Sequence, residues 1–365
     1  MKQRFLWLDF LRGGAALGVL AFHVVVVTEY KQLDGLYVLV DFFFVLSGFV
    51  LWPTLPHDRT RGYKEYSTFF FKRLLRLWPM LFFALFISNL IYWIGYFTSD
   101  DPTISIDENR GWKLVLAAIF MLQIVVSSSM FMVVPLWSLS AEWFTNLIYG
   151  FLSLINGSKG LWLGILLGYG ALNYGLDSDW QWIGFIGPIR GWEAVGRGLI
   201  DFGIGVLLRK NYQSLRKYQN IPLLIIAGYG VWWSFFSYKG FDYDNTYFVG
   251  WIFAFFILQI SKYELRPTSR MGRFARTLGL YSYGIYVYHQ ITIDFSSWWI
   301  TRPGDFDGDS LWIKYFIYKS FTVLFLAILF TWITAKIFEG PIQRWGAKRL
   351  KSAGIAKPSS NAIDS

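Results

Sequence analysis

Residues 8–24 of the chain read LDFLRGGAALGVLAFHV and have the apolar length of a membrane span. The stretch nevertheless contains Asp9, Arg12 and His23. An Arg or Asp near the centre of a transmembrane helix costs at least ~2.5 kcal/mol on insertion scales. We therefore expect these polar side chains to have partners or a function inside a bundle of helices.

The composition extends this interpretation to the whole chain. Its 365 residues are 55% hydrophobic and only 16% charged, with a mean hydropathy of +0.38. The apolar residues fall in blocks of about 17 to 27 separated by short polar loops, which is typical of helical spans rather than of a bilayer barrel. The sequence therefore predicts an all-α polytopic membrane protein.

Residue content and charge exclude several classes of site and partner. The chain has no Cys, which excludes disulfides, and its three His are too few for a multi-His metal cluster, so we expect no metal. The net charge of +10 is the excess expected in cytoplasmic loops of a membrane protein. We therefore expect the lipid bilayer, and no nucleic acid, as its partner.

Loop charges predict the topology. Lys and Arg collect in five segments that the positive-inside rule places in the cytoplasm: residues 1–4, 57–76, 209–217, 262–276 and those after 344. Acidic, Trp-rich or neutral loops alternate with them and are expected outside. The predicted spans are residues 6–27, 36–55, 77–97, 137–155, 161–176, 188–208, 221–238, 246–261, 274–293 and 312–338. We thus expect about ten transmembrane helices, with both termini cytoplasmic, in the inner membrane of the cell.

Two segments fall outside this set of spans. Residues 112–134 are apolar but lie between two outer loops, so we predict a re-entrant segment or a helical hairpin there. Residues 344–365 are basic and then polar and small, which predicts a disordered cytoplasmic tail after one membrane domain of residues 1–343.

Four predicted spans bring a titratable side chain to one depth near the outer surface. A helical rise of ~1.5 Å per residue puts His23 roughly 16 Å further out than Arg12. Asp41, Glu142 and His289 reach a similar level on their own spans. We predict that His23 is a catalytic base oriented by Asp41, with Glu142 as a further catalytic group and His289 near the substrate. Hydrogen-bonded packing and interfacial roles are the alternatives, above all for Glu142 and His289.

Two other groups of charges have a helical spacing. Arg190, Glu193, Arg197 and Asp201 lie along one helix face, either as a self-paired structural ladder or as the wall of a polar cavity. Arg73 and Arg76 lie one turn apart at the cytoplasmic mouth of a span. Because guanidinium groups bind phosphate with two hydrogen bonds, we predict that this pair holds an anionic ligand rather than only setting topology.

Five motifs follow one another in the chain: LDFLRGGAALGVLAFHV, VDFFFVLSGFVL, FFFKRLLRLWP, PLWSLSAEWF and GLYSYGIYVYHQ. Together they resemble acyltransferase family 3, integral membrane proteins that O-acylate extracytoplasmic carbohydrates. The resemblance covers most of the chain. It implies ten spans, a cytosolic acyl-CoA donor near Arg73 and Arg76, and a role in transfer for Arg12 and His23.

The resemblance also implies the substrates and partners. The acyl group is expected to be acetyl, moved from acetyl-CoA to a carbohydrate hydroxyl of a cell-surface or exported polysaccharide, with no permanently bound cofactor. Many relatives carry an additional secreted hydrolase-like domain after the membrane part. We expect no such domain here, so a second transfer step is expected to need a separate extracytoplasmic partner. A homo-oligomer is the other assembly left open.

In the implied reaction, a cytosolic thioester and an outer hydroxyl meet across a hydrocarbon core of about 30 Å. Arg12 and Arg197 are expected to line a polar path for the donor. His23 takes the proton of the attacking hydroxyl and returns it to the leaving thiolate, with an acyl-His intermediate as the alternative. Ser140 or Trp137 is a candidate donor of a hydrogen bond to the tetrahedral oxyanion.

A rival function from another class is a proton-coupled secondary transporter or flippase. In that case His23, Asp41 and Glu142 would relay protons while Arg197 bound an anionic or glycan substrate. No inverted repeat is visible in the sequence, and a transporter has little need of an arginine pair at one cytoplasmic mouth. We therefore favour the enzyme.

Overall fold

The structure is a computed structural model that describes residues 5–26, 31–57, 60, 62–98, 112–126, 133–155, 158–176, 191–236, 247–297 and 309–352. Every regular element in these ranges is a helix. Four of them are long and apolar enough to cross a bilayer, within Leu6–Val25, Leu33–Thr54, Gly62–Ile94 and Ile313–Leu350. This confirms the prediction of an all-α polytopic membrane protein. The count of ten spans and the cytoplasmic placement of both termini stay predictions.

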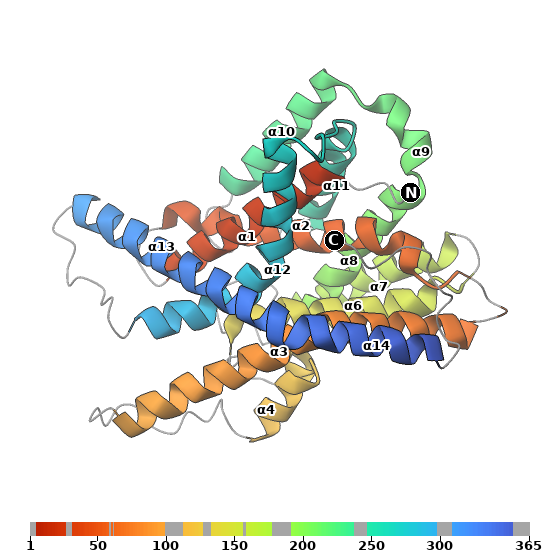
Figure 1. The fold of residues 1–365 in the computed structure, drawn as a ribbon. Helices are drawn as coiled ribbons and strands as arrows, with labels where there is room; N and C mark the ends of the chain where they lie inside the picture. The colour runs from red at the N-terminus through yellow and green to blue at the C-terminus, as the bar shows by residue number, and fades with distance from the viewer. Residues whose placement is uncertain are drawn as a thin grey trace.

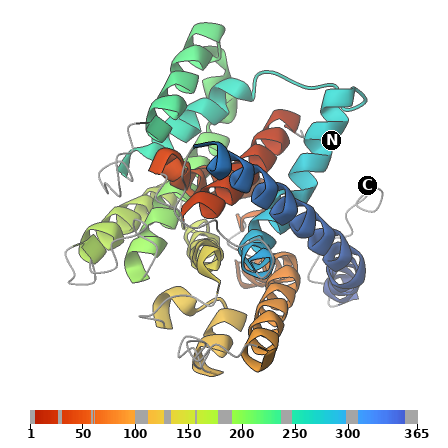
Figure 2. The same ribbon diagram turned by 90° about the vertical axis from the view of Figure 1, so that its left-hand side faces the viewer.

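The principal helices are α1 (Leu6–Val26), α2 (Leu39–Leu51), α3 (Gly62–Thr98), α6 (Trp137–Leu152), α7 (Lys159–Leu176), α8 (Gly191–Lys210), α10 (Ile221–Phe236), α11 (Val249–Ile260), α12 (Arg270–Ser296), α13 (Asp309–Thr334) and α14 (Gly340–Ser352). Two of them form the centre of the packing. Helix α8 packs against α2, α6, α7 and α11, and α12 packs against α1, α3 and α13. Figures 1 and 2 both show α10 and α11 on one side of the molecule and α3 and the short helix α4 (Trp112–Ile119) on the other.

Two short helices, α4 (Trp112–Ile119) and α5 (Gln123–Val126), lie in the stretch predicted to be re-entrant. Neither is long enough to cross a core of about 30 Å alone. The chain turns between them at Met121, whose φ of 57° is unusual for a residue with a side chain. Gln123 and Ile124 are buried against the start of α6, so this segment covers the end of that helix.

The contact between α2 and α8 depends on two glycines. A Cβ at Gly48 would lie 2.0 Å from the carbonyl oxygen of Phe202, and one at Gly205 would lie 2.0 Å from that of Val45. The two backbones therefore touch, as small residues allow in membrane helix pairs. This close approach brings Asp41, further back along α2, within reach of α8.

The C-terminal helices differ from the sequence prediction. A π-helical turn, Ala335–Glu339, joins α13 to α14, and α14 continues to Ser352. The tail expected to be disordered from residue 344 thus begins as a helix, because α14 packs against α3, where Gly346 lies against Leu75. Residues 353–365 lie outside the described residues.

The glycine contact predicts a stability difference between two Gly→Ala variants. Gly48→Ala should lower the free energy of unfolding by roughly 1–3 kcal/mol, because the new methyl group forces α2 away from α8. A methyl group at Gly14, on the exposed side of α1, would meet nothing within 4 Å, so Gly14→Ala should be neutral or slightly stabilising. Thermal unfolding of the purified variants in detergent measures both, and equal melting temperatures would contradict the contact.

Candidate active site

A cavity of about 150 Å³ opens between five helices. Its polar lining consists of Arg12 from α1, Ser47 from α2, Arg73 and Arg76 from α3, Ser138 and Glu142 from α6, and Ser282, Tyr283 and Tyr286 from α12. Apolar side chains of α2 and α6 complete the wall. The two arginines predicted to bind an anion thus share one cavity with the arginine of the first span.

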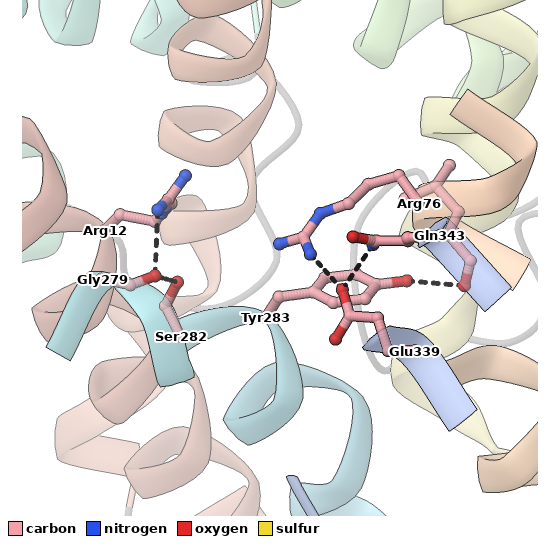
Figure 3. Close-up of polar contacts among 8 residues, drawn as sticks. Arg12, Arg76, Gly279, Ser282, Tyr283, Glu339 and Gln343 are labelled. Atoms are coloured by element: carbon pink, nitrogen blue, oxygen red, sulfur yellow. Dashed lines mark hydrogen bonds and ion pairs between the residues drawn. The ribbon is translucent and has the colours of Figure 1, made fainter. Parts of the chain in front are cut away.

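Each arginine of the α3 pair is held by a carboxylate. Arg73 donates to Glu142 at 2.7 Å, and both side chains are mostly buried. Arg76 donates to Glu339 of the π-helical turn, and Gln343 donates to the same carboxylate oxygen at 2.9 Å. In Figure 3 the guanidinium of Arg76 lies over the ring of Tyr283 and points to Glu339. Two acidic groups therefore occupy the positions where anionic ligand oxygens would bind.

Arg12 lies at another edge of the cavity, where α1 contacts α12. It donates to the carbonyl of Gly279 at 2.9 Å and to Asp9 at 3.2 Å. Ser282 donates to the same carbonyl at 2.8 Å, as Figure 3 shows. The side chain of Arg12 keeps 34% of its surface exposed, so its charge remains available to the cavity.

Two hydroxyl groups mark a further part of the cavity wall. Ser138 Oγ and the hydroxyl of Tyr286 lie 2.5 Å apart, and both are within hydrogen-bonding distance of the carbonyl of Pro135. The ring of Tyr286 also contacts His289, with centroids 5.8 Å apart. Tyr286 thus lies between the cavity and a histidine pair.

The histidine pair joins the first span to α12. His289 Nε2 lies 3.2 Å from His23 Nδ1, and the ring centroids are 4.8 Å apart. His23 Nδ1 is also 2.9 Å from the carbonyl of Val19, and His289 Nδ1 is 2.7 Å from that of Tyr286. His289 is fully buried, whereas His23 keeps 9% exposure. The two imidazoles do meet in one layer.

Asp41 does not orient His23, contrary to the prediction from helix depth. Its two oxygens accept from Arg197 Nε at 2.5 Å and Nη2 at 2.6 Å, and both side chains are 1% exposed. Arg197 also donates to the hydroxyl of Tyr37 and lies 5.4 Å from the ring of Trp137. Depth fixes the layer of a side chain but not the direction in which it points. The buried guanidinium of Arg197, on the adjacent helix α8, binds the carboxylate of Asp41 instead.

Glu142 is also displaced from its predicted position. It pairs with Arg73 instead of joining the histidine layer. The prediction from depth assumed that α6 starts at the outer membrane surface, whereas α5 covers its buried first turn. Ser140 donates to the carbonyl of Met121 at 2.5 Å and is fully buried, and Trp137 stacks near Arg197, so neither lines the cavity.

The structure identifies site residues that the sequence prediction missed. Ser138 and Glu142 are four residues apart on α6 and share the face that lines the cavity, whereas Ser140 points away from it. That helical spacing was the available signal for Ser138. Tyr286 stands three residues before His289 and gave a similar signal. No sequence pattern pointed to Glu339, because its contact with Arg76 depends on the π-helical turn.

Of the charged stripe predicted on α8, Arg197 follows neither of the two predicted arrangements. Arg190 lies outside the described residues. Arg197 bonds across to Asp41 rather than along its own helix, and it is absent from the residues lining the cavity. Within the described part of the chain, no group of three or more His, Asp or Glu side chains is placed to hold a metal ion.

Comparisons with known proteins point to one family. The model of the acyltransferase 3 family, described as an acyltransferase domain, matches residues 5–337. A curated relative, "Protein 2 in picA locus" of Rhizobium radiobacter, is 30% identical over 162 residues, which are 40% of this chain and 81% of that protein. No solved structure matches the chain significantly.

The buried ion pair predicts that Asp41 acts mainly on stability. Asp41→Ala leaves the guanidinium of Arg197 buried without its carboxylate, which should lower the free energy of unfolding by roughly 3–5 kcal/mol. The double variant Asp41→Leu, Arg197→Met removes both charges and should recover most of that loss. Thermal unfolding in detergent tests both. If Asp41→Ala kept the wild-type melting temperature, the pair would not have the structural role assigned to it.

Proposed function

The chain belongs to the acyltransferase 3 family and is a multi-pass membrane acyltransferase, and we propose that it moves an acyl group from cytosolic acyl-CoA to a hydroxyl of an extracytoplasmic carbohydrate. The proposed acyl group is acetyl, the proposed acceptor a cell-surface or exported polysaccharide, and the proposed location the inner membrane. The observation that carries the proposal is the cavity in which Arg12, Arg73 and Arg76 meet.

The arginines of α3 suit the phosphate groups of the donor. A guanidinium binds phosphate and carboxylate in the same bidentate geometry. Glu142 and Glu339 accept hydrogen bonds from Arg73 and Arg76, as the phosphate oxygens of CoA would. The side chain of Arg76 is 42% exposed, so an incoming anion can reach it without unfolding the site.

The lining of the cavity suits part of the donor. Beyond the arginines, the wall is formed by apolar side chains such as Phe43, Leu46 and Leu139, which suit the methylene groups of a pantetheine arm. The volume of about 150 Å³ holds only a segment of that arm.

The proposed chemistry uses His23 as general base. Its imidazole takes the proton from the acceptor hydroxyl while the hydroxyl oxygen bonds to the thioester carbonyl carbon. The carbon–sulfur bond then breaks, and the imidazolium returns the proton to the thiolate of CoA. Ester and free CoA thiol are the products, so atoms and charges balance. The acyl arm has to pass Tyr286 to reach the histidine pair, and the hydroxyls of Tyr286 and Ser138 are the proposed donors for the oxyanion.

The transporter alternative needs a relay that joins His23, Asp41 and Glu142. Each of these three side chains has a different partner: His289, Arg197 and Arg73 respectively. Among the described residues, therefore, nothing assembles that relay. Arg197 binds Asp41 and Tyr37 and is 1% exposed, so the described structure gives a transported anion no access to it.

The central test measures donor binding and acyl transfer together. The double variant Arg73→Ala, Arg76→Ala should raise the dissociation constant for CoA about tenfold to a hundredfold, at roughly 1–2 kcal/mol per lost charge-assisted contact. Calorimetry with the purified protein measures this constant, and the incorporation of radiolabelled acetyl from acetyl-CoA into a glycan fraction measures transfer.

Arg216→Ala is the matched control, because Arg216 is an exposed basic residue of the predicted cytoplasmic side outside the cavity. It should bind CoA like the wild type. CoA affinity that is equal in the double variant and the wild type would reject the donor site. Transfer that is absent in the wild type with every glycan fraction supplied would reject the acyl-transfer proposal.

A second prediction concerns the competition between carboxylate and phosphate. Glu339→Gln removes the charge that holds Arg76 but keeps the size of the side chain. CoA should then bind about twofold to fivefold more tightly, since a partly exposed ion pair contributes up to ~1 kcal/mol. Glu264→Gln, an exposed acidic residue outside the cavity, is the control of equal charge change. Weaker CoA binding in Glu339→Gln alone would show that the carboxylate supports the donor site instead of competing for it.

A further inference from the structure

The tautomers of the histidine pair follow from the carbonyl groups that the rings contact. A carbonyl oxygen only accepts hydrogen bonds, so a ring nitrogen beside it carries a proton. His289 Nδ1 lies 2.7 Å from the carbonyl of Tyr286, and His23 Nδ1 lies 2.9 Å from that of Val19. Both Nδ1 atoms therefore donate.

The contact between the rings agrees with this assignment. In a neutral imidazole with a protonated Nδ1, Nε2 is an acceptor. His289 Nε2 lies 3.2 Å from His23 Nδ1. The N–H of His23 Nδ1 therefore has two acceptors, the carbonyl of Val19 and His289 Nε2. The two hydrogen bonds have the same direction: His23 donates to His289, and His289 donates to the carbonyl of Tyr286. His23 Nε2 is left unprotonated and has no hydrogen bond to any residue that the structure describes.

We propose that His289 is a positioning residue that holds His23 in the tautomer with a free Nε2 and fixes the direction of its ring. The proposal rests on the proposed role of His23 as general base. It gives His289 a place in the reaction without contact with the acyl group. It also replaces Asp41, which is bound to Arg197, as the group that orients the base.

The carbonyl of Val19 cannot supply this orientation alone. It lies one turn before His23 on the same helix, where carbonyls also accept the backbone N–H of the residue four positions on. An acceptor on the same helix moves with the ring's own backbone and does not fix it against the rest of the site. His289 comes from α12, is fully buried and has its own Nδ1 anchored, so its lone pair has a fixed direction.

The same contact serves the charged form of the base. When His23 Nε2 takes the acceptor's proton, the positive charge spreads over both ring nitrogens. The Nδ1–H then donates more strongly to His289 Nε2, and a charge-assisted hydrogen bond is roughly twice as strong as a neutral one. No proton has to move to His289, because it remains a neutral acceptor throughout.

The test uses the fact that the chain contains only three His residues. The full-length protein, labelled with ¹⁵N-histidine and reconstituted in lipid, should give two buried rings protonated at Nδ1 in its nitrogen spectrum. His57→Gln removes the third signal, since His57 is exposed and contacts Trp52 far from the pair. In His289→Ala, the His23 signal should change to a mixture of tautomers.

Kinetics provide the second readout. His289→Ala should lower kcat for acyl transfer by roughly 10²-fold, since a wrong tautomer disables the base. KM for acyl-CoA and the dissociation constant for CoA should stay unchanged because the donor arginines are untouched. His289→Gln, whose amide oxygen can accept from His23 Nδ1–H, should recover part of kcat and restore a single His23 tautomer.

Two results would overturn the proposal. One is a single Nδ1-protonated tautomer of His23 in His289→Ala. The other is a loss of kcat in His289→Gln as large as in His289→Ala although the His23 spectrum is restored. The nitrogen spectra do not depend on turnover, so a wild-type protein without acyl transfer would reject the proposed function while the coupling of the two rings remained measurable.

Discussion

Ion pairs between helices hold together the parts of this bundle that bear on the site. Arg197 of α8 binds Asp41 of α2, and Arg73 of α3 binds Glu142 of α6. In a low-dielectric interior, burying a guanidinium without a carboxylate costs several kcal/mol of folding free energy. Each pair therefore favours the packing of its two helices against each other. The contact of α2 with α8 has to be close enough for the first pair to form, and Gly48 and Gly205 make it so.

The pairs divide into two kinds with different consequences. The Arg197–Asp41 pair is 1% exposed, makes bidentate contacts and is surrounded by aromatic rings, so it is a fixed part of the fold. Arg73, Arg76 and Glu142 line a cavity, and Arg76 is 42% exposed, so the proposed donor site is built on these pairs. The proposed donor chemistry uses the pairs at the cavity, and the proposed proton transfer uses the histidine pair, about one turn beyond Tyr286 along α12.

The sequence predicted the helical class, the shared layer of His23 and His289, and the grouping of Arg73 with Arg76. These rest on apolar length and on helical rise, both of which are local properties of a chain. It could not predict that Asp41 turns to Arg197, because rotation about the helix axis depends on which neighbours pack there. Ser140 was predicted as a site residue, whereas Ser138 lines the cavity, for the same reason. Glu339 lay beyond reach because five residues adopt a π-helical turn that no local pattern marks.

That turn has a consequence for the direction in which the C-terminal helix faces. A π-helical turn holds one residue more than an α-helical turn of the same rise, and one residue corresponds to about 100° of rotation. Deleting a single residue from Ala335–Glu339 would let α13 and α14 run on as one regular helix, with every side chain after it facing a new direction. Gly346 would then lose its place against Leu75 of α3. The π-helical turn thus sets which side of α14 packs against α3.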